Sequence, residues 1–293
     1  MNRAKVNKEM IRNKVEEKIS TLQISANAAS AQIGISAATM SNVLNNTWML
    51  KPELAPSDEM WRKLALWAGV ATDWNTAYTA DFKRMTGICR HAQEMSISKA
   101  ISFTPGTGKT YALKEYSNSN PSVYYIECEE YWNKKVFLQK LCSVMGINNS
   151  LLSVPEMVEV IIDFLNSKEK ILVIIDEADK LKDPVINFYK TFYNKTEAGF
   201  ILCGAPYFKN RIEKGCRLQK QTYQEIFSRI GGEFLRLKGV TDADIKLICE
   251  ANGIRDIMDI EQVKNYCNGD LRRAKSSIDK LKLEKSINIK TSA

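Results

Sequence analysis

The stretch Thr104-Pro-Gly-Thr-Gly-Lys-Thr110 decides the fold of this chain. It follows a short apolar run at 100–103, which reads as a strand, and it precedes a helical run that opens at Tyr111. Strand, glycine-rich loop and helix in this order form a P-loop, where backbone amides converge on phosphate oxygens. The motif predicts a phosphate-binding set of Thr104, Pro105, Gly106, Thr107, Gly108, Lys109, Thr110 and Tyr111.

Two residues of this loop have specific expected roles. Lys109 is expected to reach the β- and γ-phosphates and to support catalysis, and the Thr110 hydroxyl is expected to ligate Mg²⁺. Phe103 stands five residues before Gly108, where the motif usually has its first glycine. This departure predicts a stiffer entrance to the loop.

A second motif lies at 171–179, Ile-Leu-Val-Ile-Ile-Asp-Glu-Ala-Asp. Five consecutive apolar residues are typical of a strand that is buried on both faces of a parallel sheet. Asp176, at its end, is expected to hold Mg²⁺, and Glu177 is expected to polarise the attacking water. Adjacent acids repel each other unless a cation or a water network lies between them. The two motifs together predict a site for ATP and Mg²⁺.

Further strands are predicted at 123–126, 200–203 and 233–237, alternating with helical segments. One of these helices has a clear start, because Ser153 and Glu156 form a capping-box pattern around Pro155. The alternation predicts an α/β fold with a doubly wound parallel sheet and the nucleotide at the carboxyl ends of its strands.

Residues 26–44 have the spacing of two short helices joined by a tight turn. Small Ser30 allows a close crossing, Gly34 supplies the left-handed turn, and Ser36 caps the second helix. The pattern resembles the Cro/repressor-like helix-turn-helix family, whose second helix reads the major groove. The residues this resemblance would expose to DNA are small or polar and predict weak sequence specificity: Ala37, Ala38, Ser41, Asn42 and Asn45. A protein-docking bundle is the alternative interpretation.

Composition narrows the class of protein. The chain has 293 residues, a net charge of +8, seven scattered cysteines and one histidine, which argues against a disulfide framework and against zinc or multi-histidine sites. No apolar run is long enough to span a bilayer, so we expect a cytoplasmic protein without a membrane partner.

The positive charge is concentrated in one segment. Residues 207–238 hold eight basic and three acidic side chains. A polyanionic partner and a solvated helical face both account for this excess. Its first cations are the candidate DNA contacts: Lys209, Arg211, Lys214, Arg217 and Lys220.

The motif set from about 81 to 285 resembles the AAA+ ATPases. In that family Arg229 corresponds to the arginine finger, a catalytic residue that reaches the γ-phosphate of a neighbouring subunit, and Arg272 corresponds to the lid's sensor 2. Ala205 stands at the sensor 1 position without a polar side chain, which predicts slow hydrolysis or completion of the site by a partner. The expected domains are a helix-turn-helix domain at 1–72, a nucleotide-binding core at 81–239 and a helical lid with its tail at 240–293.

Nearly the whole chain is similar to the Mu B-type transposition ATPases. The resemblance implies an ATP-dependent, largely non-sequence-specific protein that binds double-stranded DNA. It also implies a homo-oligomer, a helical filament or ring on target DNA, that recruits and activates a DDE transposase. Two alternatives stay open: a replication initiator or helicase-loader ATPase, and a helix-turn-helix transcriptional regulator with a degenerate nucleotide site.

Overall fold

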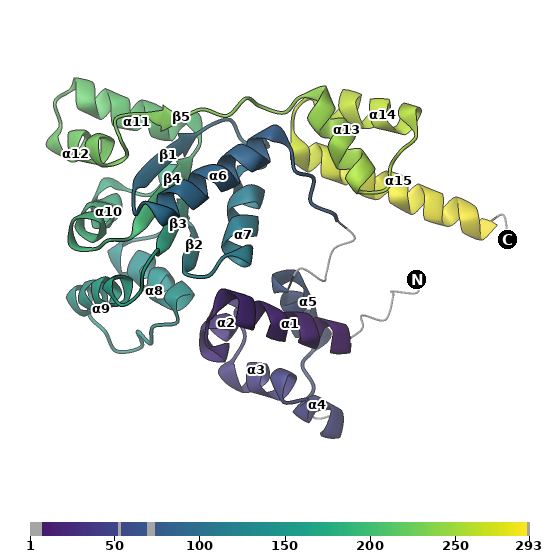
Figure 1. The fold of residues 1–293 in the computed structure, drawn as a ribbon, viewed down its shortest axis with the longest axis horizontal. Helices are drawn as coiled ribbons and strands as arrows, with labels where there is room; N and C mark the ends of the chain where they lie inside the picture. Colours follow the sequence, from purple (N-terminus) through teal and green to yellow (C-terminus); the bar gives the residue numbers. More distant parts are fainter. Residues whose placement is uncertain (1–7, 52–53, 69–73, 292–293) are drawn as a thin grey trace.

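The computed structural model describes residues 8–51, 54–68 and 74–291. Its first helices form an all-helical N-terminal module: α1 (Lys8–Leu22), α2 (Ala26–Ile33), α3 (Ala37–Leu44), α4 (Thr47–Leu50) and α5 (Asp58–Trp67). The helices of the central core are α6 (Ala80–Glu94), α7 (Lys109–Ser119), α8 (Lys134–Met145), α9 (Val154–Asn166), the 3-10 turn η2 (Ala178–Lys180), α10 (Asp183–Lys195), α11 (Pro206–Arg217) and α12 (Gln221–Arg229). The lid consists of α13 (Asp242–Ala251), α14 (Ile257–Cys267) and α15 (Leu271–Thr291) (Figure 1).

A single parallel sheet organises the core. Its strands are β1 (Ser98–Ser102), β2 (Val123–Glu127), β3 (Leu172–Asp176), β4 (Gly199–Gly204) and β5 (Phe234–Leu235), in the order β2-β3-β4-β1-β5. Every neighbouring pair is parallel. The predicted doubly wound α/β fold is confirmed. The last strand is shorter than predicted, because β5 pairs only with Ala100 and Ile101 at the edge of the sheet.

Both faces of the sheet are covered, which explains its apolar strands. Leu172 and Ile174 of β3 pack in one core cluster with residues of α6 and α7. Val173 and Ile175 point the other way, into a larger cluster with residues of α8 to α12. Because successive strand residues face opposite sides, a strand with helices on both sides is apolar at every position.

The lid has a core of its own, and the segment before α6 belongs to it. Trp74 and Ala77 pack against the buried side chains of α13, α14 and α15. Two asparagines fasten the segment: the Asn75 amide N–H donates to Asn252 Oδ1 at 2.8 Å, and Asn252 Nδ2 donates to the Asn75 carbonyl at 3.1 Å. The sequence predicts a domain boundary at 71–80, and within this stretch Trp74, Asn75 and Ala77 contact the lid.

The N-terminal module has the predicted turn and caps. Gly34 is left-handed with φ 74°, and the Ser36 side chain accepts from the Thr39 amide. The module lies against α7 and α8 of the core (Figure 1). The contact is close, because a Cβ added at Gly146 would lie 2.7 Å from the Ala28 Cβ.

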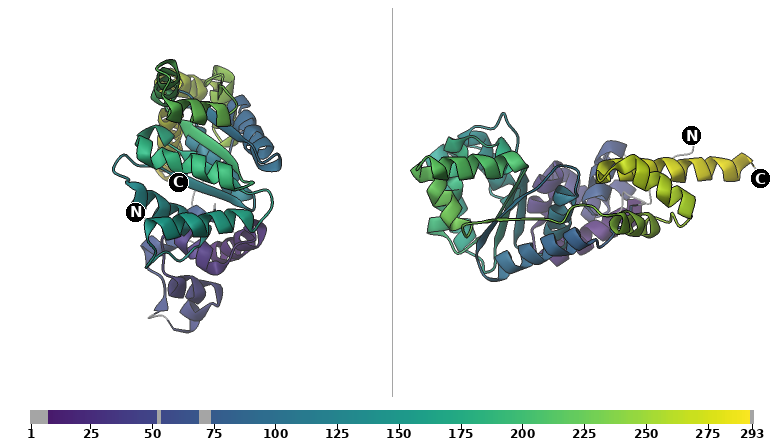
Figure 2. Two further views of the ribbon diagram at one scale, coloured as in Figure 1. Left: turned by 90° about the vertical axis from the view of Figure 1, so that its left-hand side faces the viewer. Right: turned by 90° about the horizontal axis from the view of Figure 1, so that it is seen from above.

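Figure 2 shows the lid at one end of the core, with α15 extending away from the sheet. Among the described residues, no helix is both long and apolar enough to cross a membrane. Among the described side chains, no three His, Cys, Asp or Glu groups gather where they could hold a metal ion. Cys142 and Cys203 are buried, as expected for small core residues.

Candidate nucleotide-binding site

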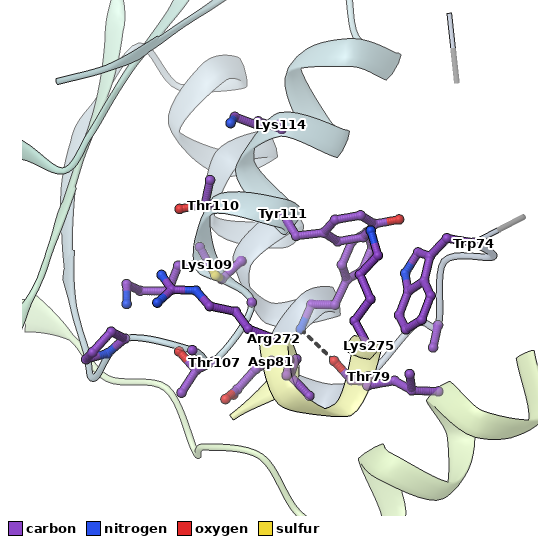
Figure 3. A pocket seen from close by; sticks show the side chains of 18 of the residues that line it. Trp74, Thr79, Asp81, Thr107, Lys109, Thr110, Tyr111, Lys114, Arg272 and Lys275 are labelled. Carbon is purple, nitrogen blue, oxygen red and sulfur yellow. Dashed lines mark hydrogen bonds between the residues drawn. The ribbon is translucent and has the colours of Figure 1, made fainter. Parts of the chain in front are cut away.

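A cavity of about 360 Å³ opens between the P-loop, the start of α6 and the lid (Figure 3). The P-loop lines it from Pro105 to Tyr111. Apolar and aromatic side chains from other segments form its remaining walls: Trp74, Ala77, Phe82, Met85, Ile248 and Leu271. A pocket with apolar walls and a few convergent polar groups is typical of a small-molecule site.

The P-loop has the backbone conformation that its glycines predict. Gly106 and Gly108 have φ of 82° and 86°, a region that side-chain-bearing residues rarely adopt. Helix α7 begins at Lys109, so its unpaired amides face the loop. The buried Lys109 side chain folds over the loop, where Nζ donates to the Phe103 carbonyl at 2.9 Å and to the Thr104 carbonyl at 2.8 Å.

The two sequence motifs meet at the Asp176 carboxylate, which is 1% exposed. Thr110 Oγ1 donates to Asp176 Oδ2 at 2.8 Å, and the Tyr125 hydroxyl donates to the same oxygen at 2.9 Å. The other oxygen, Oδ1, accepts from the Glu177 amide at 2.9 Å. The sequence assigns both Thr110 and Asp176 to Mg²⁺, and the structure joins them directly. Tyr125 carries no motif signal and was missed.

Glu177 lines the same pocket from a left-handed backbone position with φ 54°. Burial raises the pKa of its carboxyl group, and the negative charges of Asp176 and Asp179 raise that pKa further. Lys180 lies 3.9 Å from the Glu177 carboxylate and opposes the shift. Lys180 also forms a 3.2 Å ion pair with Glu129. A half-buried carboxylate with a raised pKa fits a group that accepts a proton from water.

The lid touches the P-loop directly. The Leu271 amide donates to the Gly106 carbonyl at 2.8 Å, and a Cβ added at Gly106 would lie 2.6 Å from the Asp270 carboxylate. Gly106 is therefore required by contact with the lid as well as by its φ. Arg272 extends from the lid along the P-loop side of the pocket, and Lys275 lies beside Trp74 (Figure 3). The sequence predicts Arg272 here but misses Asp270 and Lys275.

The position expected for sensor 1 is occupied by backbone contacts. The Ala205 amide donates to Asp179 Oδ1 at 3.0 Å, and Ser102 Oγ donates to the Ala205 carbonyl at 2.9 Å. A side chain at Gly204 would collide with the Asp179 carboxylate. Asp179 thus fastens the end of β4 to the turn after β3. The sequence gives no signal for this role.

Arg229 does not line the pocket of its own chain. It lies at the end of α12, where Nε donates to Asn194 Oδ1 at 3.0 Å and Nη1 lies 3.4 Å from the Glu225 carboxylate. The guanidinium also lies over the Tyr193 ring. The structure therefore places this predicted catalytic residue at a distinct site, held by its own chain.

The candidate DNA contacts of the basic segment divide into two groups. Arg211 was predicted wrongly as a surface cation, because Nη1 donates to the carbonyls of Asp179 and Leu181 at 3.2 and 2.8 Å. Its side chain is only 15% exposed, and it stabilises the turn after β3. Lys209 is half-buried and lies 3.6 Å from the Glu213 carboxylate. The remaining candidates are exposed at the end of α11 and the start of α12: Lys214, Arg217 and Lys220.

The candidate contacts on α3 lie away from the core. Ala37, Ser41 and Asn45 are exposed and Asn42 is half-buried, while Met40 and Val43 pack inside the module. The described contacts of α3 with other helices are made within the module, to α1, α2 and α4. The docked module therefore leaves this helix accessible.

Comparison with known proteins agrees with the fold. Residues 102–212 match the model of the AAA domain. The chain resembles the structure of the ORC2 protein of Aeropyrum pernix, with a TM-score of 0.52 and 15% identity over 73% of this chain and 63% of that one. Residues 102–212 therefore carry an AAA domain, in which the P-loop is joined to Asp176 at the end of a strand of the parallel sheet.

A second comparison concerns one curated relative of this chain. The chain is 27% identical over 163 residues to the ATP-dependent target DNA activator B of Escherichia phage Mu. The match covers 54% of this chain and 51% of that protein, so it spans about half the length of the relative.

Proposed function

We propose that this chain is an ATP- and Mg²⁺-dependent protein that binds double-stranded DNA and activates it as a target for transposition. The observation that carries the proposal is the P-loop joined to Asp176 in a chain similar to a target DNA activator. The name of the phage protein states ATP dependence and action on target DNA, and both are proposed here for this chain.

The oxygen groups at the pocket suit Mg²⁺. This ion prefers one or two protein oxygen ligands, with phosphate oxygens and water completing an octahedron. Thr110 and Asp176 supply a hydroxyl and a carboxylate that already lie 2.8 Å apart. When bound, Mg²⁺ would neutralise charge on the phosphates. The residues that would hold ATP are the P-loop amides, Lys109 and Arg272, with the base against the apolar wall that includes Trp74.

Phosphate oxygens would take over the contacts that Lys109 makes in the structure. Its Nζ now donates to two loop carbonyls, and a phosphate would offer this cation an anionic acceptor in the same loop. Glu177 would then accept a proton from the attacking water. Ala205 offers no side-chain hydrogen bond to that water, so hydrolysis is slow until DNA or a partner completes the site.

In an assembled oligomer, a neighbouring subunit would supply a further cation to the bound nucleotide. Arg229 lies outside its own pocket and would reach the γ-phosphate of a neighbouring subunit in a filament or ring. To do so, the guanidinium must leave Asn194 and Glu225. The contact with Asn194 is exposed to solvent, whereas the contact with Glu225 is part-buried and the Arg229 side chain is 17% exposed. The contact between subunits would have to replace both. ATP at a subunit boundary would thereby favour the homo-oligomer, and hydrolysis would loosen it.

The exposed cations of the α11–α12 hairpin would contact the DNA backbone. Lys214, Arg217 and Lys220 lie close together in sequence around the turn, next to the exposed Leu218. Each phosphate that a protein neutralises releases counterions, so binding would fall steeply with salt. The α3 face would add contacts of weak sequence specificity.

A triple variant tests this surface. Replacing Lys214, Arg217 and Lys220 with alanine should weaken duplex binding about equally for all sequences and reduce the slope of log K against log salt by about 2 to 3. Fluorescence anisotropy at several salt concentrations measures this slope. Lys246→Ala on α13 of the lid is the matched control, since this exposed cation lies outside the hairpin. An unchanged slope in the triple variant would reject the proposed DNA surface.

Nucleotide control is tested by DNA retardation with ATP, with ADP and without nucleotide. Only ATP should produce cooperative binding, and equal binding in all three conditions would reject the proposal. Glu177→Gln should retain ATP-dependent assembly and block turnover, whereas Lys109→Ala should lose both. The DDE transposase is the proposed partner, and its addition should stimulate hydrolysis. Stimulation by a replicative helicase instead would favour a helicase loader.

A further inference from the structure

Tyr125 makes a contact that the P-loop motifs do not anticipate. Its hydroxyl donates at 2.9 Å to Asp176 Oδ2, the same oxygen that accepts from Thr110 at 2.8 Å. The next acceptor of the phenol, Glu127 Oε2, lies at 3.4 Å. The stronger of the two hydrogen bonds therefore goes to the carboxylate at the centre of the site.

The sheet register explains why a tyrosine makes this contact. Tyr125 pairs with Ile174, and Glu127 pairs with Asp176 at the ends of β2 and β3. Tyr125 and Asp176 thus share a face of the sheet but stand two residues apart along it. Only a long side chain that leans along its strand spans this diagonal. A shorter residue at 125 would remove one side-chain donor from Asp176 Oδ2, to which Thr110 also donates.

Lys114 of α7 covers one face of the Tyr125 ring. Lys114 of α7 lies 5.5 Å above the ring centroid, and its Nζ forms a 2.7 Å ion pair with Glu127. The ring also lines a cavity of about 320 Å³ between the core and the N-terminal module, opposite Gln32 and Trp67. The Lys114 contact restricts the ring on one side, and the hydrogen bond to Asp176 fixes the direction of the hydroxyl.

We propose that Tyr125 is a positioning residue for the metal site, fixing the orientation of the Asp176 carboxylate. The inference rests on the proposed binding of Mg²⁺ and ATP by Thr110 and Asp176. Thr110 would turn an oxygen lone pair toward the metal, while Tyr125 is free to keep its hydrogen bond. Partners of this kind typically change metal affinity about 10- to 100-fold when removed.

Tyr125→Phe removes the hydroxyl and keeps the ring. Tyr124→Phe is the matched control, because the Tyr124 hydroxyl accepts from Lys168 at 3.3 Å and makes no contact with Asp176. The measurement is a Mg²⁺ titration of fluorescent ATP-analogue binding, with a parallel binding curve in EDTA. We expect Tyr125→Phe to raise the apparent Mg²⁺ constant about tenfold or more, with nucleotide affinity in EDTA unchanged.

Two outcomes would overturn the proposal. One is a Mg²⁺ constant for Tyr125→Phe within twofold of wild type and Tyr124→Phe. The other is an equal loss of affinity with Mg²⁺ and with EDTA, which would mark a general structural role. If the wild-type protein itself bound the nucleotide without any dependence on Mg²⁺, the proposed function would fail instead. Thermal unfolding of both variants shows whether each is folded.

Discussion

Asp81 joins the lid to the core through two backbone hydrogen bonds, and its loss should loosen the lid. The buried carboxylate accepts from the Lys238 amide at 2.9 Å and from the Gly239 amide at 2.8 Å. These amides lie between β5 and α13, where the chain leaves the sheet. Asp81→Asn keeps the shape but presents an NH₂ group to one of the two amides.

The expected loss follows from these contacts. A hydrogen bond to a charged group contributes about 1.5–3 kcal/mol. Asp81→Asn removes one of the two hydrogen bonds to the backbone amides and leaves the second with an uncharged acceptor. We therefore expect a loss of about 3 kcal/mol in local stability, which corresponds to about a hundredfold change in an equilibrium constant.

Hydrogen exchange followed by mass spectrometry measures this change directly. Peptides that span 234–241 should exchange about a hundredfold faster in Asp81→Asn than in wild type. Asp163→Asn, an exposed position on α9, is the control and should leave exchange unaltered. Exchange in Asp81→Asn within threefold of wild type would refute the assigned role of this carboxylate.

Three further predictions concern the connections between the parts of the molecule. Ala28→Gln should separate the N-terminal module from the core, because the backbone at Gly146 leaves no room for a longer side chain. Small-angle scattering should show a larger radius of gyration for this variant than for the exposed control Ala38→Gln. Asn252→Ala should destabilise the lid by about 2 kcal/mol in urea unfolding, since the buried side chain bonds both backbone groups of Asn75. Burial lowers the pKa of Lys18 to about 8 in the folded chain, so the unfolded chain binds more protons above that pH and stability should rise from pH 8 to 10. A flat thermal-unfolding profile over this range, or one that Lys18→Met leaves unchanged, would contradict that assignment.

Much of the fold was predictable because its signals are local. A buried parallel strand needs apolar residues at every position, and β3 has them from Leu172 to Ile175. The P-loop needs glycines at left-handed positions, and the caps at Ser36 and Ser153 need a side-chain oxygen three residues before an amide. Each of these requirements acts within a few residues, so it is visible in the sequence.

The candidate site was predictable only in part. Lys109, Thr110 and Asp176 belong to motifs, and the structure brings them together. Arg211 was assigned to the surface because charge alone does not show which way a helix turns its side chains. Its burial against backbone carbonyls is a property of how α11 packs on the turn after β3.

The sequence by itself determined the order of the strands along the chain, the phosphate loop and the acids that follow β3, since short-range conformational and chemical requirements specify them. Only the tertiary structure decided that Tyr125 reaches Asp176, that Asp81 holds the start of the lid and that the segment from Trp74 to Ala77 contacts that lid. The pairs Tyr125–Asp176, Asp81–Lys238 and Asn75–Asn252 stand 51, 157 and 177 positions apart, and neither partner of a pair needs the other to form its own helix or strand. Register and packing bring them together, and no local pattern encodes either one.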